Sequence, residues 1–256
     1  MGEPRPTRIQ LCGRLVVELD GRRVEEALPG TKGRLLFAYL VLNRDRRMSR
    51  DELLTAVYGE EASPDQHPSL SVLLSKLRSA IGQGVLVGRS EIELVLPPDA
   101  FVDVEAAREA LHRAESHVAA GEWAESWGPA GVAYHVARRP LLQGEDRPWL
   151  EEWRRRLEEL HLRGLECFAQ ARLGLGGSTL SQAEDCARQL IELAPYRETG
   201  HRILIEALER RGNVAEALLA YDRLRVMLRN ELGIAPSPAL QGVHSRLLAE
   251  GTTTPA

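Results

Sequence analysis

The pattern of apolar residues changes once along the chain, near Pro97-Pro98, and this change constrains the fold more than any other feature. Before it, short alternating segments typical of β-strands surround three segments with helical spacing. After it, from "FVDVEAAREAL" at residue 101 onward, amphipathic helical segments follow one another and no strand is expected. We therefore predict a mainly α protein, with an α+β domain over residues 1–98 and an all-α domain over residues 99–256.

The first domain shows the element order of a winged helix. We expect a hairpin, three helices and a second hairpin, in that order, over residues 9–25, 31–45, 49–59, 69–82 and 85–98. Asp20-Gly21 is a typical tight hairpin turn. The second helix opens with Ser49 three residues before Glu52, which is a capping box, and closes at Gly59. In a winged helix the third helix is offered to DNA and the last hairpin is the wing.

The third helix, "SLSVLLSKLRSAIG", has two different faces. At 100° per residue one face is apolar and is expected in the core: Leu70, Leu73, Leu74, Leu77 and Ile81. The other face is small and weakly basic: Ser71, Val72, Ser75, Lys76 and Ser79, flanked by Arg78. Serine hydroxyls can bind base edges or phosphates, an apolar side chain can contact a thymine methyl, and the two cations can neutralise phosphates. The simpler alternative is an ordinary solvated helix face.

Other positive charges gather in the first domain. Arg89 stands at the expected wing tip, where an arginine can enter a minor groove or can simply face solvent. A further cluster lies near helix ends and is a candidate for phosphate contacts: Lys32, Arg34, Arg46, Arg47 and Arg50. The first fifty residues hold 11 basic and 6 acidic side chains, and the next fifty hold 3 and 8, so the first hundred carry no net charge.

The second domain repeats itself weakly. The pattern Gly-x-x-Ala-Glu occurs at residues 121–125 and 212–216. Ala183 and Ala217 are 34 residues apart, which is the tetratricopeptide period. We expect tetratricopeptide-like helical hairpins, although any helical domain rich in Ala and Leu shows such coincidences. The four tryptophans are spaced four apart in pairs: Trp123 and Trp127, Trp149 and Trp153. We expect them to pack between the repeat helices, and the alternative is that they line a groove for a partner or ligand.

Long stretches of the chain resemble the SARP (antibiotic regulatory protein) family. The most specific are "LLQGEDRPWLEEWRRRLEEL" at 141–160 and "AEALLAYDRLRVMLRNELGIAPSPALQGVHSRLL" at 215–248. Members couple an OmpR-type winged helix to a tetratricopeptide-like bacterial transcriptional activator domain. The resemblance implies an activator that binds direct repeats in double-stranded promoter DNA as a side-by-side dimer. It also implies contact with RNA polymerase holoenzyme through the loop "GEEASPDQHP" at 59–68 and the helical domain.

No constellation of residues indicates an enzyme, and we expect no catalytic residue, metal or cofactor. "PGTKGR" lacks the spacing of a phosphate loop, and the histidines form no metal-binding pattern. The three cysteines, Cys12, Cys167 and Cys186, suggest buried thiols in a reducing compartment. With neither a signal-peptide pattern nor an apolar run long enough to span a membrane, we expect a cytoplasmic protein without a membrane partner.

A second hypothesis comes from another functional class. The neutral first hundred residues and the serine-rich helix face also fit a helical sensor or protein-interaction module whose winged helix has lost DNA binding.

Overall fold

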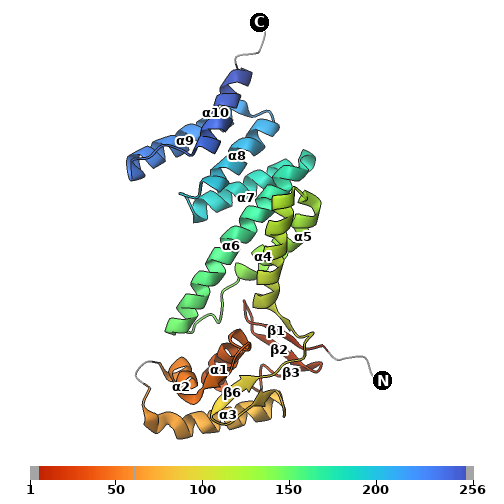
Figure 1. Cartoon of the computed structure of the whole chain (residues 1–256), viewed down its shortest axis with the longest axis vertical. Coiled ribbons are helices and arrows are strands. Elements are labelled where there is room, and N and C mark those ends of the chain that lie inside the picture. The colour runs from red at the N-terminus through yellow and green to blue at the C-terminus, as the bar shows by residue number, and fades with distance from the viewer. Residues whose placement is uncertain (1–5, 60–61, 252–256) are drawn as a thin grey trace, which may run out of the picture. The chain divides into compact units, whose positions relative to one another are not determined.

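The computed structural model describes residues 6–59 and 62–251, and these form two compact units (Figure 1). The first unit comprises the chain up to Ala106 together with Arg139–Leu157. The second comprises Ala107–Arg138 and the chain from Glu158 onward. The expected domain boundary after residue 98 stays a prediction. The contacts in the structure also place residues 139–157 in the first unit.

The first unit begins with a four-stranded sheet in the order β3-β2-β1-β7. The strands are β1 Arg8–Gln10, β2 Val16–Leu19, β3 Arg22–Arg23 and β7 Phe101–Val102. The expected tight turn is confirmed, since Asp20 and Gly21 join β2 to β3 with φ of 49° and 73°. The expectation of no strand from residue 101 onward is wrong for β7, which pairs in parallel with β1. A strand of two residues is too short to show alternation.

Three helices follow and supply the core. They are α1 Gly30–Leu42, α2 Arg50–Tyr58 and α3 His67–Ile81, with a short 3₁₀ turn η1 at Pro64–Gln66 before α3. All three expected helices are confirmed. Ser49 caps α2 as expected, because its Oγ accepts a hydrogen bond of 3.1 Å from the backbone N–H of Glu52. Fully buried leucines of the three helices, among them Leu36, Leu53 and Leu74, form the core, and each stabilises it by about 1.5–3 kcal/mol.

The wing is a three-stranded sheet in the order β4-β6-β5. Its strands are β4 Met48–Ser49, β5 Leu86–Val87 and β6 Glu91–Leu94. The expected hairpin around Gly88-Arg89-Ser90 is confirmed by the pairs Leu86↔Leu94 and Val87↔Glu93. Gly88 has φ of +89°, and a Cβ there would lie 1.8 Å from the carbonyl oxygen of Glu91. The wing turn therefore requires glycine at this position.

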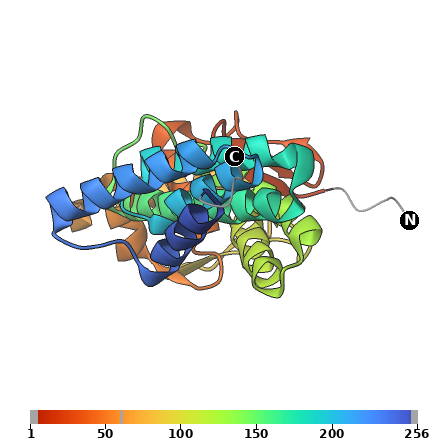
Figure 2. The same ribbon diagram turned by 90° about the horizontal axis from the view of Figure 1, so that it is seen from above.

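The rest of the described chain is helical. The helices are α4 Asp103–Ala120, α5 Trp123–Ala137, α6 Pro148–Leu175, α7 Leu180–Leu193, α8 Glu198–Arg210, α9 Val214–Leu232 and α10 Pro238–Gly251, with a 3₁₀ turn η2 at Gly177–Thr179. The helices α7, α8 and α9 each pack on the next helix along the chain (Figure 2). Gly121 and Gly212, from the repeated pattern, end α4 and α8 with φ of 74° and 80°. None of the described helices is both long and apolar enough to cross a membrane.

The repeat prediction is confirmed by packing. Ala183 of α7 and Ala217 of α9 are both fully buried. Small side chains at these positions let successive helices approach closely, which is why a 34-residue period fits paired helices.

Residues 139–157 are fastened to the first unit by contacts with α2. The Nε and Nη2 atoms of Arg147 donate to the carbonyl oxygen of Val57 at 3.3 and 3.2 Å, and Nε1 of Trp149 donates to that of Ala56 at 3.0 Å. The Trp149 ring also meets Tyr39 edge-on, with 5.1 Å between ring centroids. Since the last turn of a helix leaves carbonyl groups without an intrahelical partner, these donors cap the C-terminal end of α2.

Asp103 joins the first sheet to the start of α4. Its carboxylate accepts hydrogen bonds of 2.9 Å from the backbone N–H groups of Leu11, Cys12 and Val104. Only 3% of the residue is exposed, and this burial raises the pKa of its carboxyl above the usual range. Asp103 is therefore a structural residue, and no sequence pattern had singled it out.

Candidate nucleic-acid interface

The two faces of α3 lie as expected. The predicted apolar side chains, Leu70, Leu73, Leu74, Leu77 and Ile81, are the buried residues of the helix. Ser71, Val72, Ser75, Lys76 and Ser79 are exposed and Arg78 is half-buried. Val72 is 55% exposed, which is unusual for an apolar side chain and leaves it free to contact a partner. The helix thus offers a small, mixed surface to whatever binds there.

The serine hydroxyls of this face are partly engaged with their own helix. Ser71 Oγ donates to the carbonyl oxygen of His67 at 2.9 Å, and Ser79 Oγ donates to that of Ser75 at 3.1 Å. The lone pairs of these hydroxyl oxygens still accept hydrogen bonds. Ser71 uses this capacity, because its Oγ accepts a hydrogen bond from the guanidinium of Arg50.

A groove of about 900 Å³ runs along this face of α3. Its walls come from all three helices and from the turn before α1: Ala27, Pro29, Gly30, Tyr58, Ser69, Val72, Leu73, Ser75, Lys76, Ser79 and Ala80. The first turn of α1 has no acidic residue and no side-chain cap. Lys32 of this turn lies over the ring of Tyr58, 4.2 Å from its centroid. In this groove, the positive potential at the N-terminal end of α1 therefore adds to the charge of Lys76. Ala27, Pro29 and Tyr58 were missed from the sequence, because they belong to no pattern.

Three of the candidate cations have side chains without a partner among the residues that the structure describes. They are Arg34 on α1, Lys76 on α3 and Arg89 at the wing tip, all exposed. Since no carboxylate competes for them, they are available to phosphates.

Arg46 and Arg47, by contrast, already hold carboxylates. Arg46 forms an ion pair with Glu52, with Nη1 donating to Oε2 at 3.0 Å. Arg47 Nε donates to Oε2 of Glu93 on the wing at 2.9 Å. The Arg46 guanidinium also holds the pKa of the Glu52 carboxyl below its usual range. These pairs lower the positive charge that the sequence count assigned to this surface.

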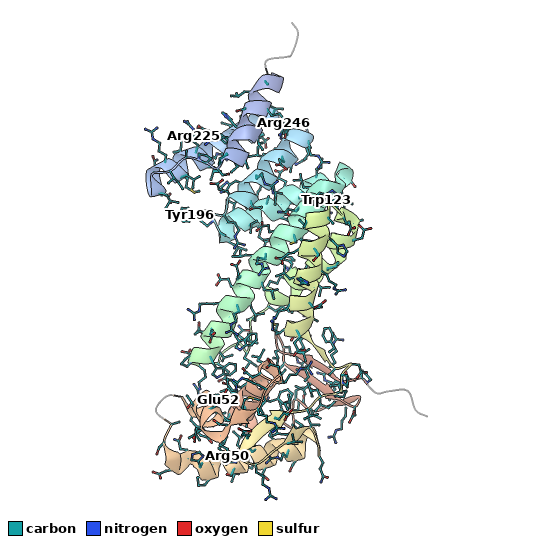
Figure 3. All side chains as sticks on the ribbon, viewed as in Figure 1. Arg50, Glu52, Trp123, Tyr196, Arg225 and Arg246 are labelled. Carbon is teal, nitrogen blue, oxygen red and sulfur yellow. The ribbon has the colours of Figure 1, made fainter. Side chains whose placement is uncertain are left out.

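Arg50 and Arg78 hold backbone oxygens rather than carboxylates. Arg78 donates from Nε to the carbonyl oxygen of Leu86 at 3.3 Å and from Nη2 to that of Gly88 at 2.7 Å. Arg50, labelled in Figure 3, lies at the start of α2. It donates to the carbonyl oxygens of Arg89 at 3.4 Å and His67 at 3.5 Å. Both arginines therefore connect the wing to the helices.

The loop at 59–68, expected to contact polymerase, is described only in part, because residues 60 and 61 lie outside the described residues. Its second half forms η1 and the start of α3.

The second unit has a groove of its own, of about 410 Å³, between α7, α8 and α9. Its lining mixes leucines with charged side chains such as Arg188, Glu192 and Arg223. Leu219 on its rim is 57% exposed. This surface can accept an amphipathic segment of a partner.

Comparison with known proteins agrees with this architecture. The bacterial transcriptional activator domain family matches residues 102–248. Regulatory protein AfsR of Streptomyces coelicolor is 32% identical over 237 residues, which cover 90% of this chain and 23% of that protein. Transcriptional regulatory protein EmbR of Mycobacterium tuberculosis is 28% identical over 251 residues, which cover 94% of this chain and 63% of that protein. The chain thus spans less than two thirds of these relatives.

A solved structure has the same fold. Mycobacterium tuberculosis EmbR, in complex with a low-affinity phosphopeptide, superimposes with a TM-score of 0.83 and 26% sequence identity. The match covers 97% of this chain and 66% of that chain. The winged helix followed by helical repeats is therefore confirmed as the fold, and the chain belongs to the SARP family of regulators, which carry a bacterial transcriptional activator domain.

Proposed function

We propose that this protein is a DNA-binding regulator of transcription, and specifically an activator. The observation that carries the proposal is the exposed small face of α3, which borders a groove and belongs to the same unit as a wing with an exposed arginine. A helix must approach base edges closely in a major groove about 12 Å wide, and small side chains permit this. The names of the relatives, regulatory protein and transcriptional regulatory protein, support the same function.

In this proposal, α3 enters the major groove. Ser71, Ser75 and Ser79 exchange hydrogen bonds with base edges or phosphates, and Val72 contacts a thymine methyl. Lys76 neutralises a phosphate, and Arg89 of the wing enters the adjacent minor groove. Lys32 and Arg34 meet the phosphate backbone beside the first turn of α1, where free N–H groups favour an anion. Arg46, Arg47, Arg50 and Arg78 contribute only where they leave their present partners.

The finer parts of the proposal come from the family. Two copies bind direct repeats side by side in promoter DNA, and the helical unit with the loop at 59–68 contacts RNA polymerase holoenzyme. The protein does this in the cytoplasm and without catalysing a reaction. The exposed apolar rim of the groove in the second unit supports a role for that unit in protein contacts.

The experiment is a DNA titration at low salt, with genomic promoter fragments, beside a thermal melt of the same samples. The variant is Ser75→Glu, because the Ser75 side chain has no hydrogen-bond partner among the described residues, whereas Ser71 binds Arg50. A glutamate there adds bulk and a negative charge close to phosphates, so DNA binding should be lost. The free energy of unfolding should change by no more than about 0.5 kcal/mol, as for other surface substitutions.

The matched control is Ser181→Glu, the same substitution at an exposed position of α7 in the second unit, which should leave DNA affinity unchanged. An unchanged affinity of Ser75→Glu, with an intact melt, would exclude α3 as the recognition helix. The alternative function, a sensor or interaction module that does not bind DNA, would then be favoured. The ion pairs of Arg46 and Arg47 and the groove of the second unit support that alternative.

A further inference from the structure

Arg78 lies beside the proposed DNA-facing side of α3, but its guanidinium contacts the backbone of the wing. Its Nε and Nη2 atoms donate to the carbonyl oxygens of Leu86 and Gly88, at 3.3 and 2.7 Å. Leu86 is the first residue of β5, and Gly88 follows β5 as the first residue of the turn that carries Arg89. The side chain is half-buried, so this is no accidental contact of a solvated arginine.

The wing needs such support. Its sheet is held by the short pairings of β5 with β6 and of β4 with β6, and by a hydrogen bond of 2.8 Å from the N–H of Val95 to the carbonyl oxygen of Val85. None of these pairings includes the turn residues 88–90, and short hairpins are marginal without further contacts. The other side of the turn is held by Arg50, which donates to the carbonyl oxygen of Arg89 at 3.4 Å. The exposed guanidinium of Arg89 therefore projects from a turn whose backbone accepts hydrogen bonds from Arg78 on one side and Arg50 on the other.

The chemistry of this contact distinguishes it from a phosphate contact. A guanidinium presents several N–H donors in one plane and can hold two carbonyl oxygens at once. A lysine ammonium is a compact charge that can meet a phosphate but cannot reproduce this planar pair of hydrogen bonds. Replacing Arg78 by lysine thus keeps the positive charge and removes the pair of hydrogen bonds to the wing.

We propose that Arg78 is a positioning residue: it fixes the wing turn against α3 and so aims Arg89 at DNA, and it does not itself bind a phosphate. This inference rests on the proposed DNA-binding function of the first unit. It reassigns Arg78 from the phosphate-binding set, and it makes the wing and α3 one rigid reading surface.

The test measures DNA affinity at several salt concentrations for the full chain and its variants. Arg89→Ala should lower the affinity by up to about tenfold and make the log–log salt slope shallower by roughly one. Arg78→Ala and Arg78→Lys should both have the same effect as Arg89→Ala. The double variant Arg78→Ala/Arg89→Ala should be no weaker than either single variant, because both changes remove one contact.

Lys76→Ala is the matched control. Lys76 lies two residues from Arg78 on the same helix, and its side chain has no partner within the described chain. In the double variant, the fold loss of DNA affinity from Lys76→Ala should therefore multiply with the fold loss from Arg89→Ala. Two results would overturn the proposal: a wild-type affinity and salt slope for Arg78→Lys, or losses of Arg78→Ala and Arg89→Ala that multiply. An Arg89→Ala variant that binds like the wild type would overturn it as well.

A second measurement does not depend on DNA. Amide hydrogen exchange of residues 86–91 in the free protein should be faster in Arg78→Lys than in the wild type, and unchanged in Lys76→Ala. Unchanged exchange in Arg78→Lys would show that the arginine does not hold the wing. If the wild type binds no promoter DNA, the proposed function fails, while the exchange measurement still decides whether Arg78 holds the wing. A thermal melt of each variant confirms that it is folded.

Discussion

The carboxylate of Glu52 binds two side chains of the first unit at once. Its Oε1 accepts a hydrogen bond of 2.6 Å from the Tyr39 hydroxyl, and its carboxylate pairs with Arg46. The ion pair lowers the pKa of the Glu52 carboxyl. Burial, together with the hydrogen bond to Glu52, raises the pKa of Tyr39 to about 12. One side chain thus joins the end of α1 to the start of α2.

Glu52→Gln should lower the free energy of unfolding at neutral pH by about 1 kcal/mol or less, because Arg46 is largely exposed and solvent screens the pair. Since the folded pKa of Glu52 is depressed, its contribution is present above the unfolded pKa of about 4.3 and is lost as the pH falls through the folded value. Urea unfolding at neutral pH and near pH ~3 measures this. The difference between wild type and variant should shrink in acid, and a constant difference would contradict the assignment.

Single residues also show how far periodicity can predict a site. The spacing of leucines in α3 correctly predicted which side chains are exposed, because direction from a helix axis depends on local geometry alone. It did not predict that Arg47 pairs with Glu93, 46 residues away, or that Arg78 binds wing carbonyls. Those partners depend on where the tertiary fold brings other elements.

Among the elements, α2 depends on a distant segment for its C-terminal cap. Trp149 donates to the carbonyl oxygen of Ala56 and packs edge-on against Tyr39. From the sequence, packing between repeat helices was expected for all four tryptophans. This is wrong for Trp149 and Trp153, which belong to the first unit. Trp127 is not enclosed between repeat helices either, since 51% of this residue is exposed. Spacing four apart predicts a shared helix face but not the partner of that face.

Trp149→Phe should keep the ring contact and lose the hydrogen bond, at a cost of about 1 kcal/mol in the free energy of unfolding. Trp149→Ala also loses the packing and should cost about 2 kcal/mol or more. Trp127→Phe is the matched control and should stay within about 0.5 kcal/mol, as an exposed substitution. Urea denaturation of the three variants decides this, and equal losses at the two tryptophans would contradict the capping role.

For the chain as a whole, the change of pattern near Pro97-Pro98 predicted the order of fold types, but it could not predict the return of residues 139–157 to the first unit. Hydrophobic periodicity records which face of an element is buried and not which other segment buries it. The same limit explains β7, which exists only because β1 lies beside it.

Cleavage of the chain at residue 98 should therefore not release the first 98 residues. A specific protease site inserted between Pro98 and Asp99, both exposed, allows the cut. After it, the pairing of β7 with β1, the hydrogen bonds of Asp103 with Leu11 and Cys12, and the contacts of Arg147 and Trp149 with α2 still join the two pieces. The pieces should elute together in native size-exclusion chromatography and separate only in denaturant. Separate elution without denaturant would show that residues 1–98 form a self-sufficient domain.

The salt dependence of DNA binding tests the whole charge distribution. The proposed interface contains eight basic side chains, but four of them, Arg46, Arg47, Arg50 and Arg78, bind carboxylates or backbone oxygens of the protein. The other four, Lys32, Arg34, Lys76 and Arg89, remain for phosphates, so each bound copy should show a log–log slope of about −4. Titrations across a salt series, with the number of bound copies measured independently, give this value. A slope near −7 per copy would require all four arginines to leave their partners, and would therefore also contradict the positioning role of Arg78. A slope between these two values would mean that Arg46 and Arg47 leave their carboxylates on DNA, because breaking an exposed ion pair costs little and each released guanidinium then displaces one counterion.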